Sequence, residues 1–196
     1  MGIADPPAVL QRYRLTADQY HLMGDAGVFA PDARVELIDG EVVEMAPMKS
    51  RHASVVGRLV AELQRVAADE ALVWCQLPLR LGSDTGPDSE PEPDLMLVRK
   101  RADFYANAHP GALDVLLLIE VADSSLEYDL GIKVPLYARH KVTEVWVVDL
   151  INKVVRFHRN PQGSDYRDVT SSAAPGAAPV AALSGVSIDL SDVFSF

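Results

Sequence analysis

Hydrophobic residues recur with helical spacing between positions 50 and 68. They occupy positions 55, 56, 59, 60, 63, 66 and 67, which fall on one face of a helix with 3.6 residues per turn. A shorter helix is predicted to begin at Thr16, because Thr16 and Gln19 have the spacing of a capping box. A third helix is predicted within residues 124–140, where Gly131 and Pro135 leave its first residue open.

Alternating and continuous apolar runs predict the strands. A hairpin is expected over residues 34–45, where Asp39-Gly40 is a two-residue turn signal. Residues 94–98 and 114–122 have the pattern of strands. The second of these is apolar on both faces, which is typical of the centre of a sheet.

The C-terminal half continues the strand pattern. Residues 144–150 and 153–159 are expected to pair as a hairpin. Residues 171–182 are low in complexity and are expected to form a surface loop, and residues 186–194 a short strand or cap. Earlier in the chain, residues 72–82 are expected to form either a strand pair or one strand bent at Pro78.

Helices and strands alternate irregularly along this order. The predicted fold class is therefore α/β (α+β), with a mixed central sheet flanked by helices. The 196 residues are enough for one domain with a sizeable core. We expect residues 1–12 to be a flexible arm and residues 13–196 to be a single domain, because no linker divides them.

The charge and composition of the chain argue against some classes of function. The net charge of −10 disfavours sequence-blind adhesion to nucleic acid. It leaves room for a local basic face, and Arg51, Arg58 and Arg65 recur every seven residues along the best-supported helix, although a solvated helix face explains them as well. The longest apolar run, residues 115–119, is too short to cross a bilayer, so we expect a cytoplasmic protein with no membrane partner. The single cysteine, Cys75, is expected to be buried or half-buried.

An acidic row precedes one of the predicted strands. In "SEPEPDLMLV", residues 89–98, Asp94 stands directly before the apolar run. If this strand pairs antiparallel with residues 115–120, Asp94 lies opposite Glu120, Met96 opposite Leu118 and Val98 opposite Leu116. Both carboxylates would then leave the same face, about 5 Å apart at Cβ. Such a pair would suit a divalent cation, and the alternative is a sheet-end pair exposed to solvent.

These segments resemble a known nuclease family. The Pro93-Asp94 dipeptide, a strand and then "EVA" at 120–122 are similar to the PD-(D/E)xK restriction-endonuclease-like core. More specifically, "VELIDGEVVEMAP", "SEPEPDLMLV", "LLLIEVADSSLEYD", "KVPLYARH" and "EVWVVDL" resemble the Uma-two family of bacterial restriction-endonuclease-like nucleases. The resemblance covers about residues 14 to 160. It implies a metal-dependent DNA endonuclease, with Asp94 and Glu120 as ligands of Mg²⁺, for which Mn²⁺ is the expected substitute.

The resemblance also suggests two further residues of the site. Glu36 matches a further acid of the family pattern and is a candidate catalytic residue and metal ligand. The alternative is an ion pair with Arg34 or another cation. His52, at the start of the best-supported helix, also matches and is a candidate metal ligand, and the alternative is a capping or core histidine.

The chain departs from the motif at one position. Ala122 stands where the motif has a lysine two residues after the second acid. Lys133 in the following helix is the candidate replacement, as in some members of the wider superfamily, and a surface lysine is the alternative. The competing interpretation of the whole chain is a catalytically weak or inactive nuclease-fold module that dimerises and binds DNA or protein. DNA is the expected partner of the endonuclease, and a homodimer is a further expectation.

Overall fold

The computed structural model describes residues 12–67, 70–82 and 87–196, which form two compact units. The smaller unit combines Met1–Met45 with Gly82–Ser89, and the larger combines Ala46–Leu81 with Glu90–Phe196. Apart from Arg12, the predicted N-terminal arm lies outside the described residues. Whether residues 13–196 fold together as a single domain is a question of independent folding, so the single domain stays a prediction.

The smaller unit contains a capped helix and a hairpin. Helix α1 (Ala17–Asp25) begins as predicted, because the Thr16 hydroxyl accepts from the Gln19 N–H and the Gln19 side chain accepts from the Thr16 N–H. Strands β1 (Val35–Ile38) and β2 (Glu41–Glu44) pair antiparallel. The turn between them has the left-handed φ angles that its sequence predicts, 47° at Asp39 and 74° at Gly40.

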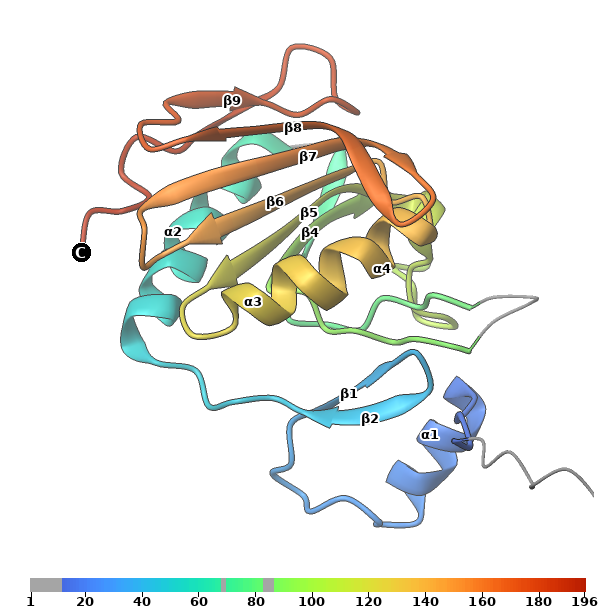
Figure 1. The fold of residues 1–196 in the computed structure, drawn as a ribbon. Helices are drawn as coiled ribbons and strands as arrows, with labels where there is room; N and C mark the ends of the chain where they lie inside the picture. The colour runs from blue at the N-terminus through green and yellow to red at the C-terminus, as the bar shows by residue number, and fades with distance from the viewer. Residues whose placement is uncertain (1–11, 68–69, 83–86) are drawn as a thin grey trace, which may run out of the picture. The chain divides into compact units, whose positions relative to one another are not determined.

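The larger unit is built on a six-stranded mixed sheet with the order β3-β4-β5-β6-β7-β8 (Figure 1). Its strands are β3 (Ala71–Cys75), β4 (Leu95–Arg99), β5 (Val115–Ala122), β6 (Glu144–Asp149), β7 (Val154–Gln162) and β8 (Asp165–Ser172). Strands β5 and β6 run parallel and every other neighbouring pair runs antiparallel. A separate short hairpin consists of β9 (Ala177–Pro179) and β10 (Ser187–Asp189).

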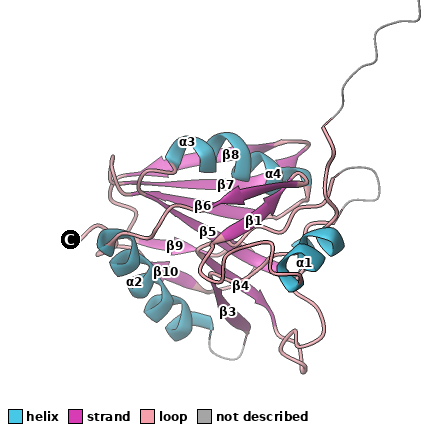
Figure 2. Ribbon diagram, turned by 90° about the horizontal axis from the view of Figure 1, so that it is seen from below, coloured by secondary structure: helices cyan, strands magenta, loops and turns pink. Residues whose placement is uncertain are grey.

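Helices cover both faces of this sheet (Figures 1 and 2). On one face lies α2 (Ser50–Ala67), whose Leu59 and Leu63 join the main core with Leu117 of β5. On the other face, α3 (Leu126–Tyr128) continues through a π-helical segment (Asp129–Lys133) into α4 (Val134–Arg139). All eight residues of β5 are buried, as expected for a central strand. The α/β class with a mixed sheet flanked by helices is confirmed.

The structure corrects three sequence predictions. Residues 72–82 are neither a strand pair nor one bent strand, because β3 ends at Cys75 and Gln76 takes a left-handed φ of 48°. Residues 171–182 are not simply a loop, since they include the end of β8 and all of β9. Val98 pairs with Val115 and not with Leu116, because the register shifts between Leu97 and Val98.

Two further predictions concern the burial of Cys75 and the membrane. Cys75 is half-buried, as predicted. It is a free cysteine, and burial raises the pKa of its thiol. Within the described residues, none of the helices combines the length and hydrophobicity needed to cross a membrane.

Candidate active site

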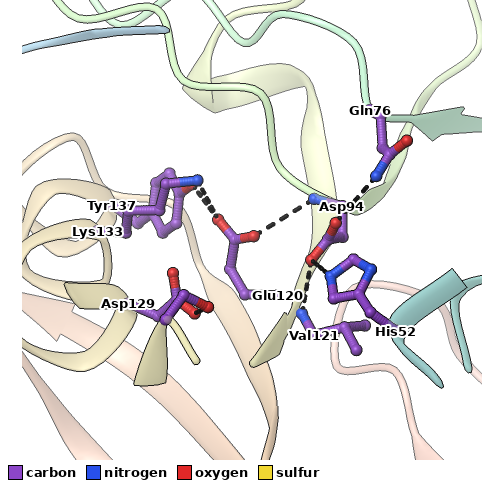
Figure 3. A network of polar contacts seen from close by, with 9 residues as sticks. His52, Gln76, Asp94, Glu120, Val121, Asp129, Lys133 and Tyr137 are labelled. Carbon is purple, nitrogen blue, oxygen red and sulfur yellow. Dashed lines mark hydrogen bonds and ion pairs between the residues drawn. The ribbon is translucent and has the colours of Figure 1, made fainter. Parts of the chain in front are cut away.

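Two acidic residues lie side by side where β4 begins and β5 ends. The antiparallel register pairs Leu95 with Ile119 and Met96 with Leu118, as predicted. Asp94, one residue before β4, therefore lies next to Glu120. The Asp94 N–H donates to Glu120 Oε2 over 3.3 Å, and the Val121 N–H donates to Asp94 Oδ2 over 2.8 Å (Figure 3). Each acid is thus fixed partly by the backbone of the opposite strand.

The Asp94 carboxylate is held from α2 and from the end of β3. His52 Nε2 lies 3.1 Å from Asp94 Oδ2, and the Gln76 amide donates to Asp94 Oδ1 over 3.2 Å. Burial alone would lower the pKa of His52. The hydrogen bond to Asp94 and the charge of Asp94 outweigh it and raise the His52 pKa above its ordinary value. His52 Nδ1 is buried and finds no hydrogen-bond partner within the described residues.

The Glu120 carboxylate is held by the helical chain that follows β5. That it leaves the same face of the sheet as the Asp94 carboxylate stays a prediction. Its Oε1 accepts from the Tyr137 hydroxyl over 2.6 Å and lies 3.3 Å from Lys133 Nζ. Burial raises the pKa of Glu120 to about 8, the charges of Asp129 and Asp94 add to this rise, and Lys133 and Tyr137 oppose it. The Lys133 side chain is only 7 % exposed, so the alternative of a surface lysine is wrong.

The helical chain after β5 explains how Lys133 reaches the sheet. Asp129, Lys133 and Tyr137 are spaced by four residues, which directs their side chains to one side of a helix. All three are buried. The Ser125 hydroxyl donates to Asp129 Oδ2 over 2.6 Å at the start of the π-helical segment. Such wide turns inside helices occur frequently at functional sites.

Three residues of the site escaped the sequence interpretation. Tyr137 and Asp129 could have been found, because each is four residues from Lys133 and therefore shares its helix face. For Gln76 no sequence signal exists, because its contact with Asp94 depends on a left-handed backbone that glutamine does not favour.

The surroundings of the two acids suit a hard divalent cation. Asp94 and Glu120 have carboxylate oxygens of the kind that Mg²⁺ prefers, and Mg²⁺ is usually held by one or two carboxylates plus substrate phosphate and water. Burial is the main cause of the raised pKa of Glu120, and the nearby charges of Asp129 and Asp94 add to it. The two carboxylates are engaged by different partners, Asp94 by residues of α2 and β3 and Glu120 by the segment leading into α4. Among residues 12–67, 70–82 and 87–196, no set of three or more histidine, cysteine, aspartate and glutamate side chains is gathered for a metal.

Glu36 belongs to the smaller unit. It is buried in β1, opposite Val43 of β2. Its assignment as a catalytic residue and metal ligand stays a prediction.

The arginines spaced along α2 are exposed, and each contacts another residue of the same chain. Arg58 donates to the Ser195 carbonyl over 2.9 Å, and Arg65 donates to the neighbouring Glu62 over 2.7 Å. The Arg51 guanidinium lies 5.0 Å from the centre of the Phe196 ring. These contacts favour the interpretation of the row as a solvated helix face.

Comparison with known proteins connects this geometry to a family. Residues 17–191 match the Uma2 family, which is described as "Putative restriction endonuclease". A solved protein from Anabaena variabilis ATCC 29413, described as "a putative nuclease belonging to DUF820", superposes with a TM-score of 0.71 at 17 % identity and covers 92 % of this chain and 98 % of its own. That likeness shows a shared fold. No curated protein matches the chain. The match over residues 17–191 shows that the chain belongs to the Uma2 family.

Proposed function

We propose that this protein is a metal-dependent endonuclease that hydrolyses phosphodiester bonds of DNA. The observation that carries the proposal is the contact of 3.3 Å between the buried Lys133 ammonium and Glu120 Oε1, beside Asp94. Two acids and one lysine are the charged groups that this chemistry requires, and the lysine is present although Ala122 occupies its usual position. Membership in a family described as restriction endonucleases supports DNA as the substrate.

Asp94 and Glu120 would hold the cation. A bound Mg²⁺, or Mn²⁺ in its place, would neutralise charge on the phosphate and lower the pKa of a water molecule. Lys133 would donate hydrogen bonds to a phosphate oxygen and stabilise the negative charge that develops there. In the reaction, the oxygen of water bonds to phosphorus, the bond from phosphorus to the sugar oxygen breaks, and that oxygen gains a proton.

His52 would act through Asp94 in this mechanism. Its Nε2 lies 3.1 Å from Asp94 Oδ2, so the imidazole can orient that carboxylate. The raised pKa of His52 means that it carries a positive charge over a wider pH range than a free histidine. A positive charge at this position would also attract the DNA phosphate.

Cleavage of supercoiled plasmid tests the proposal. The protein should convert the plasmid to nicked or linear forms with Mg²⁺ or Mn²⁺ and not with EDTA. The Asp94→Asn variant should be inactive, because it loses a carboxylate of the cation site while keeping its shape. A protein that binds Mn²⁺ and DNA but leaves the plasmid intact would instead support the inactive, DNA-binding module.

A further inference from the structure

Glu120 Oε1 receives two donors of different character. The Tyr137 hydroxyl is the closer one at 2.6 Å, a short hydrogen bond. Lys133 Nζ is farther away at 3.3 Å. Tyr137 is wholly buried, so its ring cannot move without disturbing the packing. Lysine has four side-chain torsions, so its ammonium can reach more positions than a hydroxyl on a rigid ring.

Asp94 also has one basic and one neutral partner, each on a different carboxylate oxygen. His52 supplies a basic partner, and Gln76 supplies a neutral one. Gln76 holds Asp94 twice, because its backbone N–H also donates to the Asp94 carbonyl over 3.1 Å. The left-handed φ of 48° that this requires is unfavourable for a residue other than glycine. Such strain is retained at positions where the surrounding structure requires it, and these gather at functional sites.

We propose that Tyr137 and Gln76 are positioning residues, which fix Glu120 and Asp94 for the cation while Lys133 turns toward the phosphate. The inference rests on the proposed function and assigns a task to two residues that are not part of the PD-(D/E)xK motif. Neutral donors suit this task. They hold a carboxylate without repelling a cation, whereas a fixed lysine at the same place would weaken metal binding. Partners of metal-binding side chains have such effects generally.

Calorimetric titration with Mn²⁺ tests the role of Tyr137 without reference to cleavage. Tyr137→Phe removes only the hydroxyl and should weaken Mn²⁺ binding by about 10- to 100-fold, the range typical of such outer partners. Tyr166→Phe is the matched control. It also removes a buried hydroxyl, which donates to the Val142 carbonyl over 2.7 Å, and it should leave the Mn²⁺ affinity unchanged. Both variants should lower the melting temperature of the metal-free protein to a similar extent.

Gln76→Met tests the second residue. Methionine keeps the length of the side chain and the backbone strain but cannot donate to Asp94, so Mn²⁺ affinity should fall by about tenfold or more. Asn152→Leu is the control. The Asn152 side-chain amide donates a hydrogen bond of 2.8 Å to Asp149, a carboxylate that is not part of the candidate site. This control should cost stability and not Mn²⁺ affinity.

Each outcome has a separate meaning. Affinities of Tyr137→Phe and Gln76→Met within about twofold of the unaltered protein would overturn the positioning role, since outer partners of metal sites usually matter more. If the unaltered protein binds Mn²⁺ without cleaving DNA, the endonuclease proposal fails and the positioning role is decided by the titrations. If it binds no Mn²⁺, the metal site and the positioning role both fail.

Discussion

Glu120 and Asp149 are buried carboxylates on neighbouring parallel strands, and their pKa values move in opposite directions. In β5 the pKa of Glu120 rises to about 8, first because of burial and then because Asp129 and Asp94 lie nearby. At the end of β6, burial also favours the protonated form of Asp149. Its hydrogen bonds outweigh that effect, and the pKa of Asp149 falls below its ordinary value.

The difference lies in the donors that surround each carboxylate. Asp149 accepts from the N–H groups of Ile151 and Asn152, from the Asn152 amide and from Arg156. A buried carboxylate with so many donors is stable as an anion and serves the turn that follows β6. Glu120 is instead surrounded by other acids as well as by donors. A buried acid whose neighbours do not compensate its charge is a candidate for function, and one that is fully compensated is a candidate for structure.

The largest expected effect comes from removing the charge of Glu120. Glu120→Gln should abolish Mn²⁺ binding in calorimetry and plasmid cleavage, because the amide keeps the shape but loses the charge that attracts the cation. Above pH 8, where the unaltered protein carries the buried charge, the metal-free variant should melt at the same or a higher temperature. Asp149→Asn is the control and should keep its Mn²⁺ affinity. Equal Mn²⁺ affinity in Glu120→Gln and the unaltered protein would contradict the comparison.

Lys133 should matter for cleavage and not for metal binding. Lys133→Ala should slow plasmid cleavage by about 100-fold, the range for loss of one donor to a developing negative charge. Mn²⁺ binding should persist, because an ammonium group is not a ligand. Lys133→Arg should restore only part of the activity, since a planar guanidinium does not replace a compact ammonium. The exposed Lys153 provides a control, Lys153→Ala, with no expected change. Full activity in Lys133→Ala would leave His52 or bound water as the active group.

The pH dependence of stability should show the raised pKa of Glu120. Its carboxyl group ionises near 4.5 in the unfolded chain and near 8 in the fold. Between these values the folded state holds the extra proton, so the free energy of unfolding should decrease as pH rises. The total should be on the order of 2 kcal/mol, less than the full shift implies, because neighbouring groups titrate together. Urea titrations in EDTA measure it, and Glu120→Gln should lack this decrease. An equally steep decrease in the variant would assign it to other groups, such as His52.

The sequence allowed prediction of the fold class and of the neighbourhood of the two acids. An antiparallel pairing of residues 94–98 with residues 115–120 was assumed, and it placed Asp94 opposite Glu120; the observed register of β4 and β5 agrees with it up to Leu97. The resemblance to the Uma-two family then pointed to Lys133, whose approach to Glu120 follows from the helix after β5.

The remaining differences have physical causes. Strand β8 was missed because only Tyr166 among its residues is buried, so the strand has no alternating pattern. The register shift after Leu97 was missed because Val115 and Leu116 are both apolar and either could face Val98. The contacts of Gln76 arise from tertiary structure and a strained backbone, which local sequence does not encode.

The smallest expected effect concerns Asp149, the buried acid whose charge is offset by hydrogen-bond donors. Asp149→Asn keeps an oxygen that can accept from Ile151 and Asn152 but loses the charged contact of 3.1 Å with Arg156, which is partly exposed. At neutral pH we expect a loss of about 1 kcal/mol in the free energy of unfolding, because solvent screens the charged contact at the partly exposed Arg156. The lowered pKa of Asp149 stabilises the fold above 3.8, its ordinary value, and this contribution is lost as pH falls through the lowered value. Urea titrations should therefore show the difference between the variant and the unaltered protein disappearing in acid. For Glu120→Gln the difference should instead grow as pH rises toward 8. A difference for Asp149→Asn that persists at low pH would mean that packing, and not charge, determines the role of Asp149.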